Sequence, residues 1–120
     1  MKLRHTMVSQ GDHLLVEVAG DYDYGDLIDA LVALRAECER QGMDKAIVDL
    51  TGLVGFQKGF DRYYLGRAVA ERIGTSVKLA VVGKREDHDE GFGESTAKNH
   101  GADLSVFFDR RAAMDWLRSS

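Results

Sequence analysis

The sequence has no proline and only one cysteine, Cys38, among its 120 residues. A single cysteine cannot form an internal disulfide, and the chain lacks the Cys or Cys/His spacing of a zinc site. It also lacks any apolar run near the roughly 20 residues that a membrane-spanning helix needs, and its first residues contain no signal-peptide core. We therefore expect a single domain over residues 1–120, in the cytoplasm and without a transmembrane segment.

Basic residues are not in excess either. The chain has 16 Lys and Arg residues against 20 Asp and Glu residues, which gives a net charge of -4 at pH 7. Nucleic acids and anionic membranes generally select a basic surface, so this balance argues against a nucleic-acid partner. Hydrophobic residues make up 44% of the chain and charged residues 30%, as is typical of a globular domain with one core.

Glycine and acidic residues separate the segments that have strand or helix patterns. Two strands joined by a glycine turn come first, and helices then alternate with strands. This order predicts an α/β fold in which a five-stranded, mostly parallel sheet has an N-terminal hairpin, four helices and strands in sequential spatial order. The expected strands cover 3–9, 13–19, 45–50, 77–83 and 104–108, and the expected helices cover 24–41, a segment that begins between Phe56 and Phe60 and ends at Gly74, 90–100, and the residues after Asp109.

The residue types needed for catalysis are present but not arranged for it. Cys38 falls on the apolar face of the first helix and is expected to be a small buried hydrophobe. None of the four histidines is placed near a serine or cysteine nucleophile, so no catalytic residue is expected. The run Asp-His-Asp-Glu at 87–90 contains metal-ligand types, but adjacent loop residues rarely converge on one ion. We expect a solvated loop there, and neither a metal nor a cofactor.

The strand that begins at Lys45 leads into the run Asp-Leu-Thr-Gly. Asp49 is expected to end this strand, where its carboxylate can accept hydrogen bonds from nearby backbone N–H groups, and Gly52 is expected to permit a sharp turn. Ligands gather at the carboxyl ends of strands in such sheets. Asp49 and Thr51 therefore form either a binding surface or only a structural turn, and the sequence leaves both interpretations open.

The segment after this run contains a cluster of aromatic residues and one lysine. Backbone N–H groups at a helix start can bind an anion, and Lys58 would help, although no glycine-rich nucleotide motif is present. Phe56, Phe60, Tyr63 and Tyr64 either fill the core or line an apolar crevice between helices. We expect Phe60 and Tyr64 to lie on the buried face of the helix and Phe56 to be partly exposed.

The order of elements and the segment IVDLTGLVGF resemble the STAS domain, the SpoIIAA-like fold of anti-sigma factor antagonists. That family has a phosphorylatable serine a few residues further on, at the start of the next helix. This chain differs, because it has no Ser or Thr between Gly52 and Gly74. The resemblance implies a non-enzymatic regulatory module, and the difference predicts that an anti-sigma type of kinase does not modify residues 53–73.

The C-terminal third is similar to small stand-alone bacterial proteins described as STAS/SEC14-like or SpoIIAA-like. Fold relatives of that group include lipid-carrying domains, so the similarity implies a second function, the carriage of a small apolar or lipid-like ligand between the helices. The residues that match the shared pattern are Phe92, Ala97, Asn99, His100, Gly101, the run 106–109, Ala113, Trp116 and Leu117.

The leading prediction is a STAS-like regulatory or binding module that binds an unidentified protein partner or a small apolar or anionic ligand. A homo-oligomer is left open. The predicted site combines the end of the third strand, the start of the second helix and the neighbouring face of the third helix. Its residues are Asp49, Thr51, Gly52, Phe56, Lys58, Phe60, Tyr63, Tyr64, Ser95 and Thr96.

Overall fold

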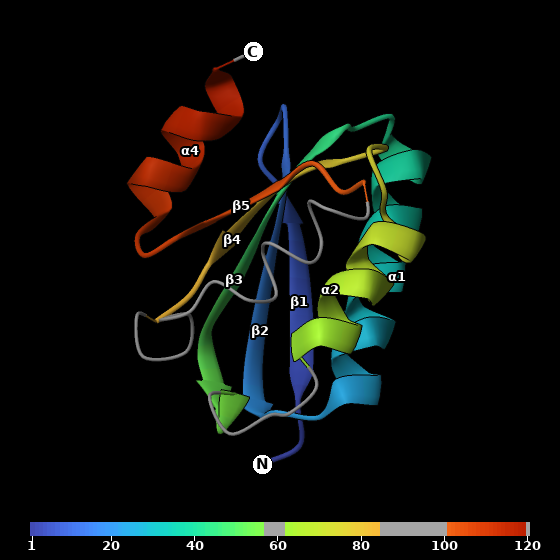
Figure 1. The fold of residues 1–120 in the computed structure, drawn as a ribbon. Helices are drawn as coiled ribbons and strands as arrows, with labels where there is room; N and C mark the ends of the chain where they lie inside the picture. The colour runs from blue at the N-terminus through green and yellow to red at the C-terminus, as the bar shows by residue number, and fades with distance from the viewer. Residues whose placement is uncertain (57–61, 85–100, 120) are drawn as a thin grey trace.

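A five-stranded sheet with helices on both faces forms the centre of the molecule (Figure 1). The structure is a computed structural model that describes residues 1–56, 62–84 and 101–119, apart from the side chains of residues 62 and 63. The strands are β1 (Arg4–Ser9), β2 (Leu14–Asp21), β3 (Lys45–Val54), β4 (Lys78–Val82) and β5 (Leu104–Phe107), and the helices are α1 (Tyr24–Gln41), α2 (Arg62–Arg72) and α4 (Arg110–Arg118).

The sheet has the topology that the sequence predicts. Its strands lie in the order β1-β2-β3-β4-β5, β1 is antiparallel to β2, and the remaining neighbours are parallel. The mixed α/β fold with an N-terminal hairpin is therefore confirmed. The helix expected over 90–100 lies outside the described residues.

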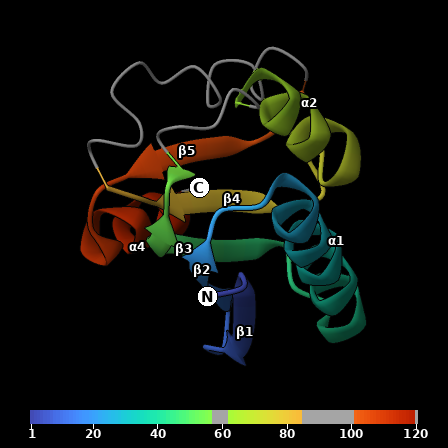
Figure 2. The same cartoon turned by 90° about the horizontal axis from the view of Figure 1, so that it is seen from below.

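The helices are divided between the two faces of the sheet. Figure 2 shows α1 and α2 on one face and α4 on the other. Right-handed crossovers between parallel strands in sequential order always pass over the same face. The helices α1 and α2 are such crossovers, whereas α4 follows the last strand and covers the opposite face.

Two apolar clusters fill the space between the sheet and its helices. The larger cluster lies on the α1 side and includes Leu14, Leu79 and Leu34. The smaller cluster lies on the α4 side and joins Ile47 of the sheet to Leu117 of the helix. Strands buried on both faces have nearly continuous apolar runs, which is why β3 and β4 are so apolar in sequence.

Helix α1 has the ends that its sequence predicts. The side chain of Asp23 accepts a hydrogen bond from the N–H of Asp26 at 2.9 Å and so caps the first turn. Gly42 ends the helix in the left-handed conformation, with φ at 68°. Cys38 is fully buried and burial raises the pKa of its thiol, which agrees with a packing role.

Candidate functional site

Strand β3 runs further than the sequence analysis expected. It continues through Val54, so Asp49, Thr51 and Gly52 lie within the strand, and the prediction that the strand ends at Asp49 was wrong. The register explains why the sequence looked like a turn. Asp49 pairs with Glu17 and Gly52 with Ala19, so three residue steps on β3 face two steps on β2. This extra residue on β3 forms a β-bulge, which uses the same residue types as a turn.

The carboxylate of Asp49 holds the bulge together. One of its oxygens, Oδ1, accepts hydrogen bonds from the Thr51 backbone N–H at 2.9 Å and from the Thr51 hydroxyl at 2.6 Å. The other oxygen, Oδ2, accepts a hydrogen bond from Nε of Arg110 at 2.8 Å. Arg110 also donates from Nη2 to Glu17 at 2.8 Å. Asp49 therefore connects the first turn of α4 to the middle of the sheet.

These contacts set the charge state of Asp49. Burial of the side chain favours the neutral acid, but the hydrogen bonds from Thr51 and Arg110 outweigh it, so the pKa of Asp49 lies below its ordinary value. The carboxylate is ionised at neutral pH and both its oxygens are occupied. This arrangement supports a structural role for Asp49 in holding the strand end in place.

Gly52 is required for close packing between two strands. A Cβ atom at this position would lie 2.9 Å from Cβ of Ala19 and 3.1 Å from the carbonyl oxygen of Val18, both on β2. Real Cβ atoms essentially never come as close as 2.9 Å to another atom, so a side chain would push β2 and β3 apart at the bulge. Gly52 thus serves the bulge through its small size, and not through a turn.

The end of β3 is fixed on two sides and exposes an apolar side chain. The carbonyl of Val54 accepts a hydrogen bond from the N–H of Tyr22 at 2.8 Å, and the carbonyl of Leu53 accepts one from Nζ of Lys84 at 2.9 Å. The side chain of Val54 is nevertheless 62% exposed. Gly55 follows with φ at 84°, a conformation that favours glycine, and turns the chain out of the sheet.

Phe56 lies in the core and not on the surface. It is 4% exposed, belongs to the larger apolar cluster and packs against Tyr22 with 5.1 Å between ring centroids. The expectation of a partly exposed Phe56 was therefore wrong. The positive φ of Gly55 lets the chain turn directly after β3, and Phe56 is buried against Tyr22 at that point.

A groove separates α1 from α2. Its volume is about 380 Å³, and the hydroxyl of Tyr24 on α1 donates across it to the carbonyl oxygen of Tyr64 on α2 at 3.4 Å. The side chain of Tyr64 is 61% exposed, so the expectation that it lies on the buried face was also wrong. The lining residues are Tyr24, Gly25, Ile28, Asp29, Tyr64, Arg67, Ala68, Glu71 and Arg72.

The structure brings together only part of the predicted site. Asp49, Thr51 and Gly52 share the bulge, Phe56 lies in the larger apolar cluster, and Tyr64 lines the α1–α2 groove. The sequence analysis missed Arg110, because it is 61 positions from Asp49 and no local pattern links the two. Five other predicted positions, or their side chains, lie outside the described residues: Lys58, Phe60, Tyr63, Ser95 and Thr96.

The described part of the chain contains no group of three or more His, Cys, Asp or Glu side chains placed to hold a metal ion. Within the same residues, no helix is both long enough and apolar enough to cross a membrane.

Solved structures share the fold over nearly the whole chain. The crystal structure of an anti-sigma factor antagonist from Mycobacterium paratuberculosis superposes with a TM-score of 0.67, at 14% sequence identity, over 98% of this chain and 96% of that chain. An uncharacterised protein with a SpoIIAA-like fold from Shewanella loihica gives a TM-score of 0.56 at 20% identity, over 96% of this chain and 93% of that chain. No protein-family model and no curated protein matches the sequence.

These likenesses define the class of fold to which the molecule belongs. The chain has the SpoIIAA-like fold of STAS domains. The resemblance seen in the segment IVDLTGLVGF and in the order of elements is thereby confirmed at the level of the fold.

Proposed function

We propose that the chain is a non-enzymatic, STAS-like regulatory module that binds a partner protein at the carboxyl end of β3. The observation that carries the proposal is Val54, an apolar side chain that is highly exposed at the end of an otherwise largely buried strand. Thr51 and Gly52 are exposed beside it and extend the same surface. Parallel sheets commonly present their binding residues at this end of the strands.

The fixed backbone around Val54 supports this proposal. Hydrogen bonds from Tyr22 and Lys84 hold the last two carbonyl groups of β3. A few residues earlier in the same strand, the hydrogen bonds between Asp49 and Thr51 hold the bulge. A surface that is already ordered loses little conformational entropy when a partner binds. The full-length fold likeness to a protein described as an anti-sigma factor antagonist further supports a regulatory role with a protein as the partner.

Replacement of Val54 by aspartate tests the proposal. The purified chain and Val54→Asp would be used to capture proteins from lysate of the source cells, with quantification by mass spectrometry. The partner should be recovered with the wild type and reduced by at least about tenfold with Val54→Asp, which is the effect of losing an interface hot spot. Val32→Asp, at another exposed valine on α1, is the matched control and should capture normally. Equal recovery with Val54→Asp would reject this surface.

The α1–α2 groove favours a second function, the carriage of a small amphipathic ligand. Its volume of about 380 Å³ falls in the range of ligand sites, and Tyr24, Ile28 and Tyr64 give it apolar walls. Gly25 leaves space in the groove, since a Cβ built there meets only the Asp23 carboxylate, at 3.5 Å. A Gly25→Leu substitution would therefore fill the groove without disturbing the backbone.

Native mass spectrometry of freshly purified protein separates this second function from the first. A carrier should retain a ligand that Gly25→Leu loses and that Ala36→Leu, on the exposed side of α1, keeps. Protein without any bound small molecule would contradict the carrier and leave the protein-binding module as the function.

A further inference from the structure

Strand β1 forms an open edge of the sheet. It has one neighbour, β2, and pairs with it over six residues without a register shift. Figure 2 shows β1 at the end of the sheet, with no described segment on its outer side. Open edges of this kind readily pair with another strand unless proline, a bulge or an inward-pointing charge blocks them. The segment Arg4–Ser9 contains no proline and no bulge.

The hydrogen-bond alternation shows which backbone groups of β1 face outward. The N–H of Gln10 donates to the carbonyl of His13 at 2.9 Å, so these two residues form a bonded pair next to the turn. Bonded and non-bonded pairs alternate along an antiparallel ladder. Every second residue back from Gln10 therefore has its N–H and C=O groups bonded to β2. These residues are Val8, which pairs with Leu15, and Thr6, which pairs with Glu17.

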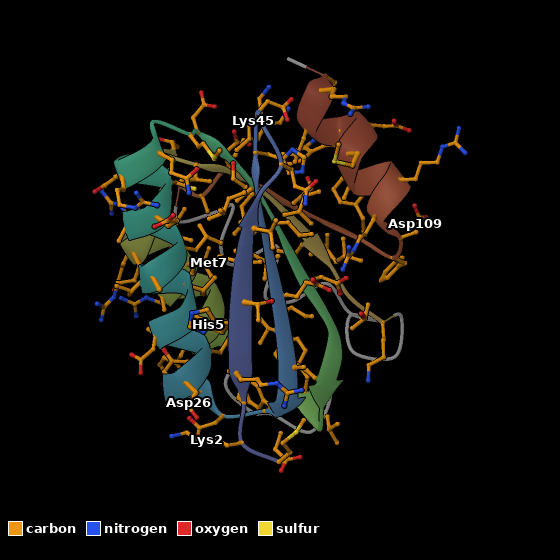
Figure 3. The ribbon with its side chains drawn as sticks, turned by 180° about the vertical axis from the view of Figure 1, so that it is seen from behind. Lys2, His5, Met7, Asp26, Lys45 and Asp109 are labelled. Atoms are coloured by element: carbon orange, nitrogen blue, oxygen red, sulfur yellow. The ribbon has the colours of Figure 1, made fainter. Side chains whose placement is uncertain are left out.

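The intervening residues are His5, Met7 and Ser9. Their N–H and C=O groups point away from β2 and have no strand beside them in the described chain. The side chains of His5 and Met7 lie on the face that α1 covers, as Figure 3 shows. The outer edge is thus made of backbone donors and acceptors, spaced as another antiparallel strand requires.

We propose that β1 pairs with β1 of a second copy of this chain, antiparallel and centred on Met7, to give one continuous sheet. This register matches every outward backbone group with a complementary one, because His5 faces Ser9 of the second copy and Met7 faces Met7. Such a self-complementary contact is the geometry of a two-fold dimer.

Charges and apolar contacts are compatible with this register. Arg4 would face Gln10 of the second copy, so no two like charges are opposed. Val8 is 48% exposed in the single chain. In the dimer it would face Thr6 of the second copy, on the sheet face opposite α1, and its exposed surface would decrease. A register centred on His5 would instead place two imidazoles opposite each other and leave Val8 unpaired.

A proline substitution can test the outer edge of β1 separately from its pairing with β2. His5→Pro removes an outward N–H and leaves the ladder to β2 intact, which is where sheets tolerate proline. The wild type should form a dimer whose population rises with concentration in light scattering coupled to size exclusion, and His5→Pro should be a folded monomer. His5→Thr keeps the N–H and should still dimerise. Val8→Lys should also give a monomer.

Amide hydrogen exchange supplies the residue-level signature. The N–H groups of His5, Met7 and Ser9 should become protected as concentration rises, while those of Thr6 and Val8 should be protected throughout. A monomer at all concentrations up to about 1 mM would overturn the proposal. So would a dimer that neither His5→Pro nor Val8→Lys affects, or an edge that is protected only by a different protein in cell extract.

Discussion

At the scale of single residues, Asp49 joins β3 to α4 through one carboxylate. It binds the bulge through Thr51 and the start of α4 through Arg110, which also contacts Glu17 on β2. Removal of its charge should therefore weaken the whole arrangement. Asp49→Asn can still accept from Thr51 but offers no charge to Arg110, so it should lower the free energy of unfolding by about 1–3 kcal/mol at pH 7.

The effect of Asp49→Asn should depend on pH with a definite sign. The pKa of Asp49 is lowered in the folded chain, so its stabilising contribution is present above the unfolded pKa of about 3.9 and is lost as pH falls through the lower folded value. Urea denaturation should show the wild type and Asp49→Asn converging below about pH 4. Glu71→Gln, at an exposed ion pair, should change little at any pH. A difference that stays constant between pH 7 and pH 3 would contradict this account.

Phe56 and Val54 are two positions apart and should respond in opposite ways to truncation. Phe56→Ala leaves a cavity in the larger core cluster and should cost about 3–5 kcal/mol. Val54→Ala removes only exposed apolar surface and should stay within about 0.5 kcal/mol of the wild type. Thermal and urea unfolding of the two variants decides the matter. Similar small losses for both would mean that Phe56 is not a core residue.

The sequence could not distinguish these two residues because the decisive information is not local. Asp49, Thr51 and Gly52 have the chemistry of a turn, and the same chemistry serves a bulge once β2 fixes the register. The strand then continues to Val54, and Gly55 places Phe56 in the core. From the sequence alone, Phe56 stands between Gly55 and Gln57 before the first turn of the next helix, which is why it was expected to be partly exposed.

At the scale of elements, helices with local signals were predicted well. The bounds of α1 match the prediction because Asp23 caps it, Gly42 ends it and leucines mark its buried face. Helix α2 was predicted less well. Its buried side chains are Leu65, Ala68, Val69 and Ala70, and Ile73 is buried just after its end. Tyr64 is exposed, although an aromatic residue in that position looked like core.

Both ends of α4 are held by side-chain contacts, Arg110 with Asp49 at the start and Lys78 with Trp116 at the end. The fluorescence of Trp116 can report on the second contact. The ammonium of Lys78 lies 4.5 Å from the ring centroid of Trp116 and donates to the Trp116 carbonyl at 2.8 Å and to the carbonyl of Ser119. A cation placed there also complements the helix dipole. Lys78→Met should free this end of α4 at a cost of about 1 kcal/mol.

Because Trp116 is the only tryptophan, its fluorescence follows α4 alone. In Lys78→Met the fluorescence change should occur at lower urea concentration than the loss of far-UV circular dichroism. Lys45→Met, on the neighbouring strand β3, is the control and should keep the two transitions together. Coincident transitions in Lys78→Met would show that Lys78 does not hold the helix.

At the scale of the whole molecule, the sequential strand order makes α4 the one helix of the described chain that covers its face of the sheet. The two crossover helices, α1 and α2, are committed to the opposite face, so nothing else described replaces α4 if it is lost (Figure 2). Removal of the helix would expose Leu15, Ile47 and Ala80, which are buried against Ala113 and Leu117. It would also break the contact between Arg110 and Asp49.

A chain that ends at Asp109 should therefore keep its strands, because the larger cluster on the α1 side remains, but it should bind the dye ANS and associate through the uncovered face. The experiment is best done with His5→Pro present, so that pairing of β1 edges does not contribute to the association. Leu117→Asp, which unseats the helix without shortening the chain, should give the same dye binding. A truncated chain that is monomeric, binds no dye and melts like the full chain would show that the second face does not need α4. The stability of the fold would then reside entirely in the cluster between the sheet and α1.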